Sequence, residues 1–179
     1  MTTYAALLRA VNVGGTGKVA MADLRKAVEG IGYKNVRTLL QSGNLIFETH
    51  AKSPEKALEA AFEKAFGFKT DIHVRDGAEL AEVIARNPFP KEAKSDPARL
   101  HVLFMRKAPT AENFKALDAA IKGPERVRGD GRHAYLHYPD GAGASKLTSA
   151  VIARHLGTPG TARNWNTVTK LAAMASSEK

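Results

Sequence analysis

Tyr4-Ala-Ala-Leu-Leu-Arg-Ala-Val-Asn-Val-Gly-Gly15 is a short apolar run that leads into two glycines near the start of the chain. Such a run followed by a glycine-rich turn is typical of a buried strand and the loop after it. Its residues are apolar at consecutive positions, whereas a strand with one face in water alternates apolar and polar residues. We therefore expect a central strand whose sheet is covered on both faces, with helices on one of them.

The segments that follow alternate between helical and strand patterns as far as residue 86. Leu24, Val28 and Ile31 share one face of a helix. Ser42 and Gly43 lie between two short apolar runs, as in the turn of a hairpin. The first half is predicted to contain a strand, a helix, a hairpin, a helix, a strand and a helix, near residues 4–11, 24–32, 36–47, 54–66, 70–75 and 77–86.

The second half repeats this order at an offset of roughly 90 residues. Thr110 precedes a helical stripe, Gly129-Asp-Gly131 marks a second hairpin, and Ser145 is predicted to cap the next helix. The predicted segments are again a strand, a helix, a hairpin, a helix, a strand and a helix, near residues 100–106, 110–121, 127–138, 145–157, 161–163 and 168–175.

The order β-α-β-β-α-β is that of the split βαβ motif of ferredoxin-like folds. With right-handed crossovers the strands lie in the order 4-1-3-2, and neighbouring strands are antiparallel. We therefore predict an α+β protein built by tandem duplication of a ferredoxin-like unit, each with a mainly antiparallel sheet, plus a C-terminal helix. The predicted subdomains are residues 1–90, which end in a trailing helix, and residues 91–179, which end in the C-terminal helix.

The composition excludes several classes of protein. Of the 179 residues, 44% are apolar and 25% are charged, which is typical of a globular chain and not of a disordered one. Cysteine is absent from the sequence, so disulfides, thiolate catalysis and cysteine zinc sites are excluded. No apolar stretch approaches the roughly 18 residues that a membrane span needs, and the first residues lack the layout of a signal peptide. We expect a cytoplasmic protein with no membrane partner.

The predicted topology brings two polar loops of the first half together. In a split βαβ unit, the loop after the first strand and the hairpin between the second and third strands lie at one end of the sheet. Glycine amides beside an arginine and a lysine suit an oxyanion or a phosphate. The residues of this predicted ligand-binding site are Arg9, Asn12, Gly14, Gly15, Lys18, Gln41, Ser42 and Asn44. The alternative is that these loops contain only turn-forming residues.

The second half places a glycine-rich loop and a tryptophan-containing segment at one end of its sheet. Gly141-Ala-Gly-Ala-Ser-Lys146 links a strand to a helix, but it lacks the spacing of a P-loop. The segment after the last strand is predicted to adjoin that loop. The predicted ligand-binding residues here are Ser145, Lys146, Arg163, Asn164, Trp165 and Asn166. Alternatively, the asparagines cap a helix and the tryptophan packs in the core.

Two histidines of the second half lie on one strand. His133 and His137 are about 13 Å apart in an extended chain, too far to share a metal ion, so no metal site is predicted. With Tyr135, Arg126 and Arg128 they could form a basic sheet face for RNA, but the aromatic signature of such platforms is absent. A solvated edge face is the favoured interpretation.

Four separated motifs span most of the chain. They are Leu7-Leu-Arg-Ala-Val-Asn-Val-Gly-Gly15 with Lys18 and Met21, Leu40-Gln-Ser-Gly-Asn44, the loop of Gly141, Gly143, Ser145, Lys146 and Leu147, and Arg163-Asn-Trp-Asn-Thr-Val168. From about Tyr4 to Met174 the chain closely resembles the family catalogued as domain of unknown function 1697. The resemblance implies a bacterial α+β protein with two related subdomains, and it implies no activity. Ala10 and Val11 stand where that family often has glycine and isoleucine, which places a methyl group beside the first loop.

Three functional classes follow from these observations. Residues 91–179 carry a net charge of +7 and residues 1–90 one of +2, and a basic half favours anionic partners. The first hypothesis is a protein that binds a small anionic ligand, a nucleotide or a phosphorylated metabolite, through the loops named above. The second is nucleic-acid binding through the basic C-terminal half, and the third is a structural or interaction module whose polar motifs are caps and turns. The sequence predicts no cofactor and assigns neither a reaction nor an oligomeric state.

Overall fold

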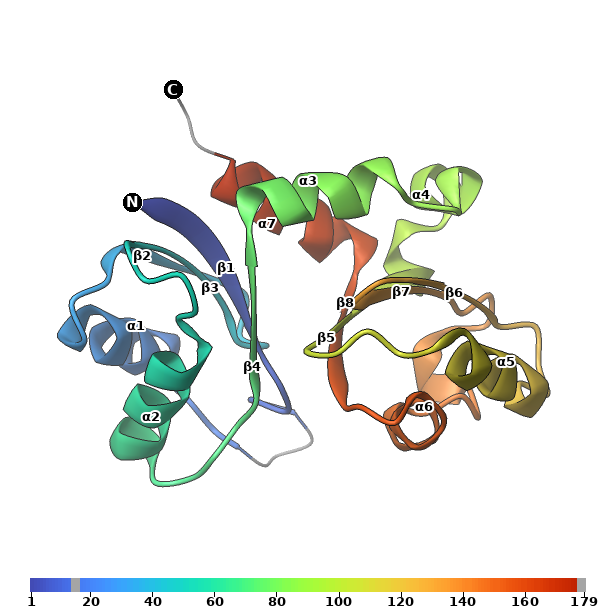
Figure 1. Ribbon diagram of the computed structural model, residues 1–179, viewed down its shortest axis with the longest axis horizontal. Coiled ribbons are helices and arrows are strands. Elements are labelled where there is room, and N and C mark those ends of the chain that lie inside the picture. Colours follow the sequence, from blue (N-terminus) through green and yellow to red (C-terminus); the bar gives the residue numbers. More distant parts are fainter. Residues whose placement is uncertain (14–16, 177–179) are drawn as a thin grey trace. The chain divides into compact units, whose positions relative to one another are not determined.

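The computed structural model describes residues 1–13 and 17–176 (Figure 1). The chain divides into two compact units, each with one four-stranded sheet. Unit 1 consists of Met1–Glu82 with Lys170–Lys179, and unit 2 consists of Val83–Thr169. The boundary between subdomains at residue 90 stays a prediction from the sequence.

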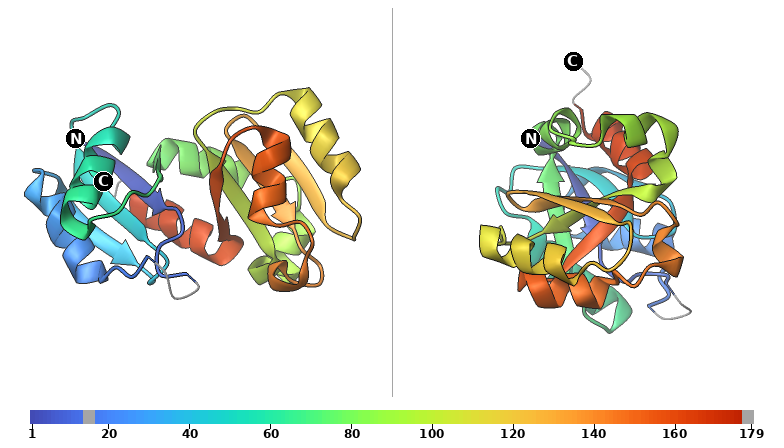
Figure 2. Two further views of the ribbon diagram at one scale, coloured as in Figure 1. Left: turned by 90° about the horizontal axis from the view of Figure 1, so that it is seen from below. Right: turned by 90° about the vertical axis from the view of Figure 1, so that its right-hand side faces the viewer.

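The sheet of unit 1 has the predicted strand order. Its strands are β1 (Thr2–Leu8), β2 (Lys34–Leu39), β3 (Asn44–Thr49) and β4 (Ile72–Asp76), arranged β2-β3-β1-β4 with every neighbour antiparallel. Helices α1 (Met21–Gly30) and α2 (Glu55–Phe66) cover one face of this sheet, as Figures 1 and 2 show. This is the split βαβ arrangement.

The central strand β1 is buried on both faces. Ala6 and Leu8 contribute to a core that includes Leu24 of α1. The alternate residues Ala5 and Leu7 are 0% exposed as well. This burial confirms the interpretation of the consecutive apolar residues, because a strand with one wet face would expose every second side chain.

Unit 2 repeats the arrangement. Strands β5 (Leu100–Met105), β6 (Arg126–Asp130), β7 (His133–His137) and β8 (Gly160–Asn164) form an antiparallel sheet in the order β6-β7-β5-β8. Helices α5 (Ala111–Ala120) and α6 (Ser149–Leu156) cover one face of it (Figure 2). The α+β class and the tandem duplication of a ferredoxin-like unit are therefore confirmed, as is the C-terminal helix, α7 (Trp165–Ala175).

Short helical segments complete the fold. Between β4 and β5 lie α3 (Gly77–Ala85), α4 (Pro90–Ser95) and the 3-10 turn η1 (Pro97–Arg99), and a second 3-10 turn, η2 (Ala142–Ala144), follows β7. Within residues 1–13 and 17–176, no helix combines the length and the apolar character of a membrane-crossing segment.

Helix α6 begins later than the sequence predicts. The hydroxyl oxygen of Thr148 accepts the backbone N–H of Val151, which makes Thr148 the N-cap. The prediction that Ser145 caps this helix is wrong. The Ser145 hydroxyl instead donates to the carboxylate of Glu125 at 2.5 Å. It therefore holds the side chain of the residue that immediately precedes β6.

Candidate functional site

The loop after β1 and the β2–β3 hairpin meet at one end of the sheet of unit 1, as the topology predicts. Asn12 joins them, because its Nδ2 donates to the carbonyl oxygen of Gln41 at 2.7 Å and to that of Val19 at 2.8 Å. Its Oδ1 accepts the backbone N–H of Val19 at 2.7 Å. Asn12 also has a φ of 55°, which asparagine tolerates better than most residues. The Asn12 side chain is thus committed to holding two loops together.

Asn44 closes the same hairpin from inside. Its side chain is fully buried, and Nδ2 donates to the carbonyl oxygen of Leu39 at 2.9 Å and to Oγ of Ser42 at 3.1 Å. Gly43 has a φ of 83°, and a Cβ there would lie 3.0 Å from the Cβ of Leu8. Two predicted site residues, Ser42 and Asn44, are therefore brought together, and they bond to each other within a tightly packed turn.

The other polar residues predicted at this end differ in their surroundings. Lys18 and Gln41 are exposed. Gly14 and Gly15 lie outside the described residues. An oxyanion site on the amides of these glycines stays a prediction.

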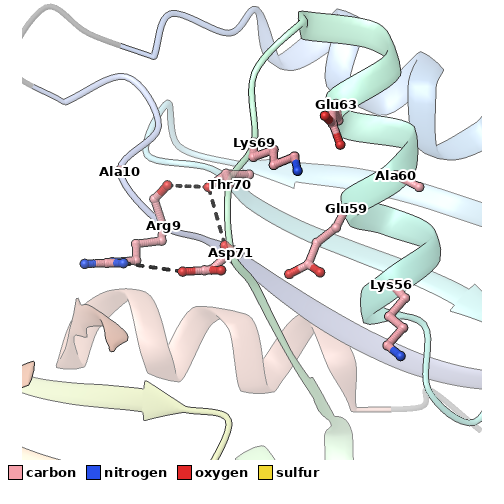
Figure 3. A pocket seen from close by; sticks show the side chains of 9 residues that line it. All are labelled: Arg9, Ala10, Lys56, Glu59, Ala60, Glu63, Lys69, Thr70 and Asp71. Atoms are coloured by element: carbon pink, nitrogen blue, oxygen red, sulfur yellow. Dashed lines mark hydrogen bonds and ion pairs between the residues drawn. The ribbon is translucent and has the colours of Figure 1, made fainter. Parts of the chain in front are cut away.

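Arg9 lines a cavity of about 600 Å³ in unit 1, called the unit 1 cavity (Figure 3). Its guanidinium forms an ion pair with Asp71 at 3.3 Å, and both side chains are about 40% exposed. The hydroxyl of Thr70 donates to the carbonyl oxygen of Arg9 at 2.5 Å. In Figure 3 the carboxylate of Glu59 reaches from α2 toward the segment of Asp71, and the side chain of Lys69 points toward α2.

The charges that line the unit 1 cavity balance. Its full lining is Arg9, Ala10, Lys56, Glu59, Ala60, Glu63, Lys69, Thr70 and Asp71, with three basic and three acidic side chains. Because opposite charges lie close together, this cavity offers no electrostatic preference for an anion.

Ser145 and Lys146 line a second cavity, of about 540 Å³, called the unit 2 cavity. It lies between the segment after α5, the loop after β7 and helix α6. Its apolar walls include Ile121, Leu147 and Val151. Its charged residues are Lys122, Glu125, Asp140, Lys146 and Arg154.

The basic side chains of the unit 2 cavity have no ion-pair partner among the residues that the structure describes. In the part of the chain that the structure describes, no ion pair joins Lys122, Lys146 or Arg154 to a carboxylate. Glu125, whose carboxylate accepts a hydrogen bond from Ser145, and Asp140 line the same cavity, so its charged side chains are three basic and two acidic. The lining therefore has a net charge of +1, which favours an anion more than the balanced charges of the unit 1 cavity do.

Arg163 lies on a different face of unit 2. In β8 it pairs with Val102 of β5, whereas Ala162 pairs with Leu103 of the core beneath α5 and α6. Its side chain therefore lies on the sheet face opposite to those helices. Its Nη1 donates to Oγ1 of Thr161 at 2.6 Å and to the carbonyl oxygen of Ala162 at 3.0 Å. Burial lowers the pKa of the Arg163 guanidinium to about 10.

The residues after Arg163 form the start of α7. Asn164 Oδ1 accepts the backbone N–H of Thr167 at 3.0 Å, so Asn164 caps the helix. Trp165 is 8% exposed, and Asn166 is exposed. β7 and β8 are both antiparallel to β5, so the loop after β7 and this segment follow strands that end on the same side. Among the described residues, however, those from 163 to 166 do not line the unit 2 cavity.

The strand face that carries Tyr135 and His137 is buried. Tyr135 is 1% exposed and its hydroxyl donates to the carbonyl oxygen of Val83 at 2.6 Å. His137 is 7% exposed, and its Nε2 lies 3.2 Å from Oδ2 of Asp96. The interpretation of this face as a solvated edge is wrong, because residues that precede β5 cover it. Because Tyr135 and His137 are buried, this strand face is not accessible as an aromatic platform for RNA.

A family model described as "Protein of unknown function (DUF1697)" matches residues 1–135. The chain belongs to this family. The match confirms the resemblance drawn from the sequence motifs, and the motifs at residues 141–147 and 163–168 lie beyond the matched part. A search of curated proteins found no match.

Solved structures also match this DUF1697 protein. A conserved bacterial protein from Streptococcus pneumoniae is 24% identical to it, with a TM-score of 0.71, over 98% of this chain and 99% of that chain. An unknown protein from Galdieria sulphuraria is 14% identical over 91% of this chain and 96% of that chain, with a TM-score of 0.24. The first comparison shows a shared fold, and the second has too low a score to support an argument.

Most charged residues of the unit 2 cavity were not among those that the sequence predicted. Lys122 and Glu125 follow α5, and Arg154 lies in α6, so the cavity exists only because these helices pack on the same face of the sheet. The signal present in the sequence was the segment Lys122-Gly-Pro-Glu125, in which charged residues flank a turn-forming pair.

Proposed function

We propose that the unit 2 cavity binds a small anionic ligand, a nucleotide or a phosphorylated metabolite. The observation that carries this proposal is the set of Lys122, Lys146 and Arg154, which line one cavity and have no ion pair in the described part of the chain. A bound phosphate would gain charge-assisted hydrogen bonds from them without breaking an existing ion pair. The cavity volume of about 540 Å³ falls within the range of roughly 300–1,000 Å³ that is common for small-molecule sites.

The walls of the cavity support a ligand with an organic part. Ile121, Leu147 and Val151 supply apolar surface beside the basic groups. Small-molecule sites combine such surface with a few polar groups that fix the orientation of the ligand. An anion with a carbon skeleton would therefore contact both kinds of surface, whereas a free inorganic ion would use only the cations.

Calorimetric titration at low salt tests the proposal. The wild type is titrated with AMP, a sugar phosphate and inorganic phosphate, and the Lys146→Ala variant is titrated in parallel. We expect Lys146→Ala to weaken binding by roughly ten- to a hundredfold, since a charge-assisted hydrogen bond contributes roughly 1.5–3 kcal/mol. Lys107→Ala is the matched control, because Lys107 is an exposed lysine of the same unit outside the cavity.

Two results would count against the proposal. Equal affinity of the wild type and of Lys146→Ala for a probe would show that the probe binds outside the unit 2 cavity. If neither protein binds any of the probes, the proposed anion binding is wrong. Affinity for DNA or RNA that falls steeply with salt and is unchanged in Lys146→Ala would favour the hypothesis of nucleic-acid binding through the basic half.

A further inference from the structure

Glu125 has a fixed orientation at the edge of the unit 2 cavity. The backbone N–H of Leu147 donates to Oγ of Ser145 at 3.0 Å, and the Ser145 hydroxyl donates to Oε1 of Glu125 at 2.5 Å. Because an ionised carboxylate can only accept hydrogen bonds, the serine hydroxyl donates its proton to Glu125 while its oxygen accepts from Leu147. The loop after β7 thus holds a carboxylate that belongs to the segment before β6.

Gly123 makes room for this carboxylate. A Cβ at Gly123 would collide with Oε2 of Glu125, although Gly123 does not have a positive φ that would itself require glycine. Ser145 thus holds the carboxylate by a hydrogen bond, and Gly123 leaves open the space that the carboxylate occupies.

The fixed carboxylate lies among basic groups with which it does not pair. Lys122, Lys146 and Arg154 line the same cavity, and within the described ranges none of them forms an ion pair with Glu125. The cavity thus presents hydrogen-bond donors with positive charge and, separately, two carboxylates that accept hydrogen bonds, Glu125 and Asp140, of which Glu125 is held in place by Ser145. An ionised carboxylate accepts hydrogen bonds only, so it suits hydroxyl groups of a ligand and repels a second anionic group.

From this arrangement we propose that the ligand of the unit 2 cavity is a sugar phosphate, whose phosphate meets the basic side chains and whose hydroxyls donate to Glu125. This inference rests on the proposed anion-binding function. None of the described residues that line the cavity is aromatic, so a nucleotide would find no ring on which its base could stack. Trp165, an aromatic residue that the sequence placed among the ligand-binding residues, is buried outside the lining of this cavity.

Titration with three probes tests the inference. Glucose 6-phosphate, AMP and inorganic phosphate all supply a phosphate, but only the first presents a full set of sugar hydroxyls without a base. We expect glucose 6-phosphate to bind at least tenfold more tightly than inorganic phosphate and more tightly than AMP. We expect Glu125→Gln to reduce the affinity for glucose 6-phosphate about tenfold and to leave or raise the affinity for inorganic phosphate.

Controls separate recognition from folding. Glutamine at position 125 retains the oxygen that accepts from Ser145, so this variant should keep the wild-type melting temperature. Ser145→Ala should weaken binding of glucose 6-phosphate less than Glu125→Gln, because it loosens the carboxylate without removing it. Asp118→Asn, at an exposed carboxylate of α5 outside the cavity, should change neither affinity.

The outcomes distinguish this inference from the function on which it rests. If glucose 6-phosphate binds no more tightly than inorganic phosphate, or if Glu125→Gln lowers both affinities equally, the assignment of a sugar phosphate is overturned and anion binding stands. If none of the three probes binds the wild-type protein, both the inference and the proposed function are overturned.

Discussion

Arg75 and Arg163 occupy the same position in the two units. Arg75 of β4 pairs with Ala5 of β1, and Arg163 of β8 pairs with Val102 of β5. The arginines are 1% and 9% exposed, and each lies on the sheet face opposite to the helices that cover its sheet. Duplication has therefore kept a buried arginine at the same point of the fourth strand.

The residue after each arginine caps the next helix. Asp76 Oδ1 accepts the backbone N–H of Glu79 at 2.8 Å, and Asn164 Oδ1 accepts that of Thr167 at 3.0 Å. Each carboxylate or amide satisfies an N–H group that the first turn of a helix leaves without a partner. The repetition of an arginine followed by a cap favours a structural role for both members of the pair.

If Arg163 has a structural role, replacing its side chain with a shorter one should destabilise the protein. We expect Arg163→Ala to lower the free energy of unfolding by about 2–3 kcal/mol, because it removes the hydrogen bonds to Thr161 and Ala162 and leaves a cavity. Arg163→Met should lose less, because it keeps apolar volume and removes a charge that burial disfavours. Urea unfolding of the three proteins measures the difference. An Arg163→Ala variant as stable as the wild type would contradict the structural role.

The same strand shows what the sequence could and could not predict. The order of the strands follows from short connections and the handedness of crossovers, so the periodicity of the chain was enough to predict it. The burial of Arg163 was not predictable in this way. Alternation along a strand tells which residues share a face, but not what covers that face. The sequence leaves two roles open for Asn164, a ligand-binding residue and a helix cap, and the structure shows that it caps α7.

The candidate site was predictable only in part for a related reason. Ser145 and Lys146 were predicted because they lie in one glycine-rich loop, whose residues are adjacent in the sequence. Lys122, which follows α5, and Arg154 of α6 are 32 positions apart and line one cavity because α5 and α6 pack on the same face of the sheet. Residues that line one cavity in this way leave no motif in a single sequence.

The start of α3 packs closely on α7, and this contact gives a second prediction. A Cβ at Gly77 would lie 2.5 Å from the carbonyl oxygen of Ala175, a backbone atom that cannot move without moving its helix. We expect Gly77→Ala to lower the free energy of unfolding by about 1–3 kcal/mol. Thermal unfolding followed by circular dichroism measures the change.

Gly30 supplies the matched control for Gly77. It lies at the end of α1, and no atom is within 4 Å of a Cβ added there. Gly30→Ala should therefore be neutral or should stabilise the protein by up to about 1 kcal/mol, because alanine favours helices. Equal effects of the two substitutions would be inconsistent with close packing of α3 on α7.

Ala10 has a strained backbone conformation. Its φ is 54°, in the left-handed region that costs a residue with a Cβ roughly 1–2 kcal/mol. Ala10→Gly relieves this strain. It also increases the conformational entropy of the unfolded chain, which lowers the free energy of unfolding by roughly 0.4–1 kcal/mol. We expect a net stabilisation of about 0.5–1 kcal/mol, visible as a higher urea midpoint with an unchanged slope. Ala27→Gly, within α1, should destabilise the protein, and a loss of stability in both variants would rule out strain at Ala10.

The buried hydroxyl of Tyr135 should make the folded protein less stable at alkaline pH. Burial, with a smaller contribution from Asp130, raises the pKa of its hydroxyl from 10.0 to about 12. In the unfolded chain the same hydroxyl ionises near pH 10, so Tyr135 stabilises the fold fully below pH 10. This contribution disappears as the pH rises from 10 to 12. At pH 8 we expect Tyr135→Phe to be about 1 kcal/mol less stable than the wild type, because it lacks the hydrogen bond to Val83.

Above pH 10 the stability advantage of the wild type over Tyr135→Phe should shrink and then reverse, because only the wild type has a buried hydroxyl to ionise and a pKa raised from 10.0 to about 12 costs it more than the roughly 1 kcal/mol of the hydrogen bond. Melting temperatures at pH 8, 10 and 11.5 measure this change. Tyr4→Phe is the control, since the pKa of Tyr4 is raised less and its hydroxyl is only partly buried. The difference in stability between Tyr4→Phe and the wild type should change less with pH. A constant difference between Tyr135→Phe and the wild type at all three pH values would contradict the raised pKa of Tyr135.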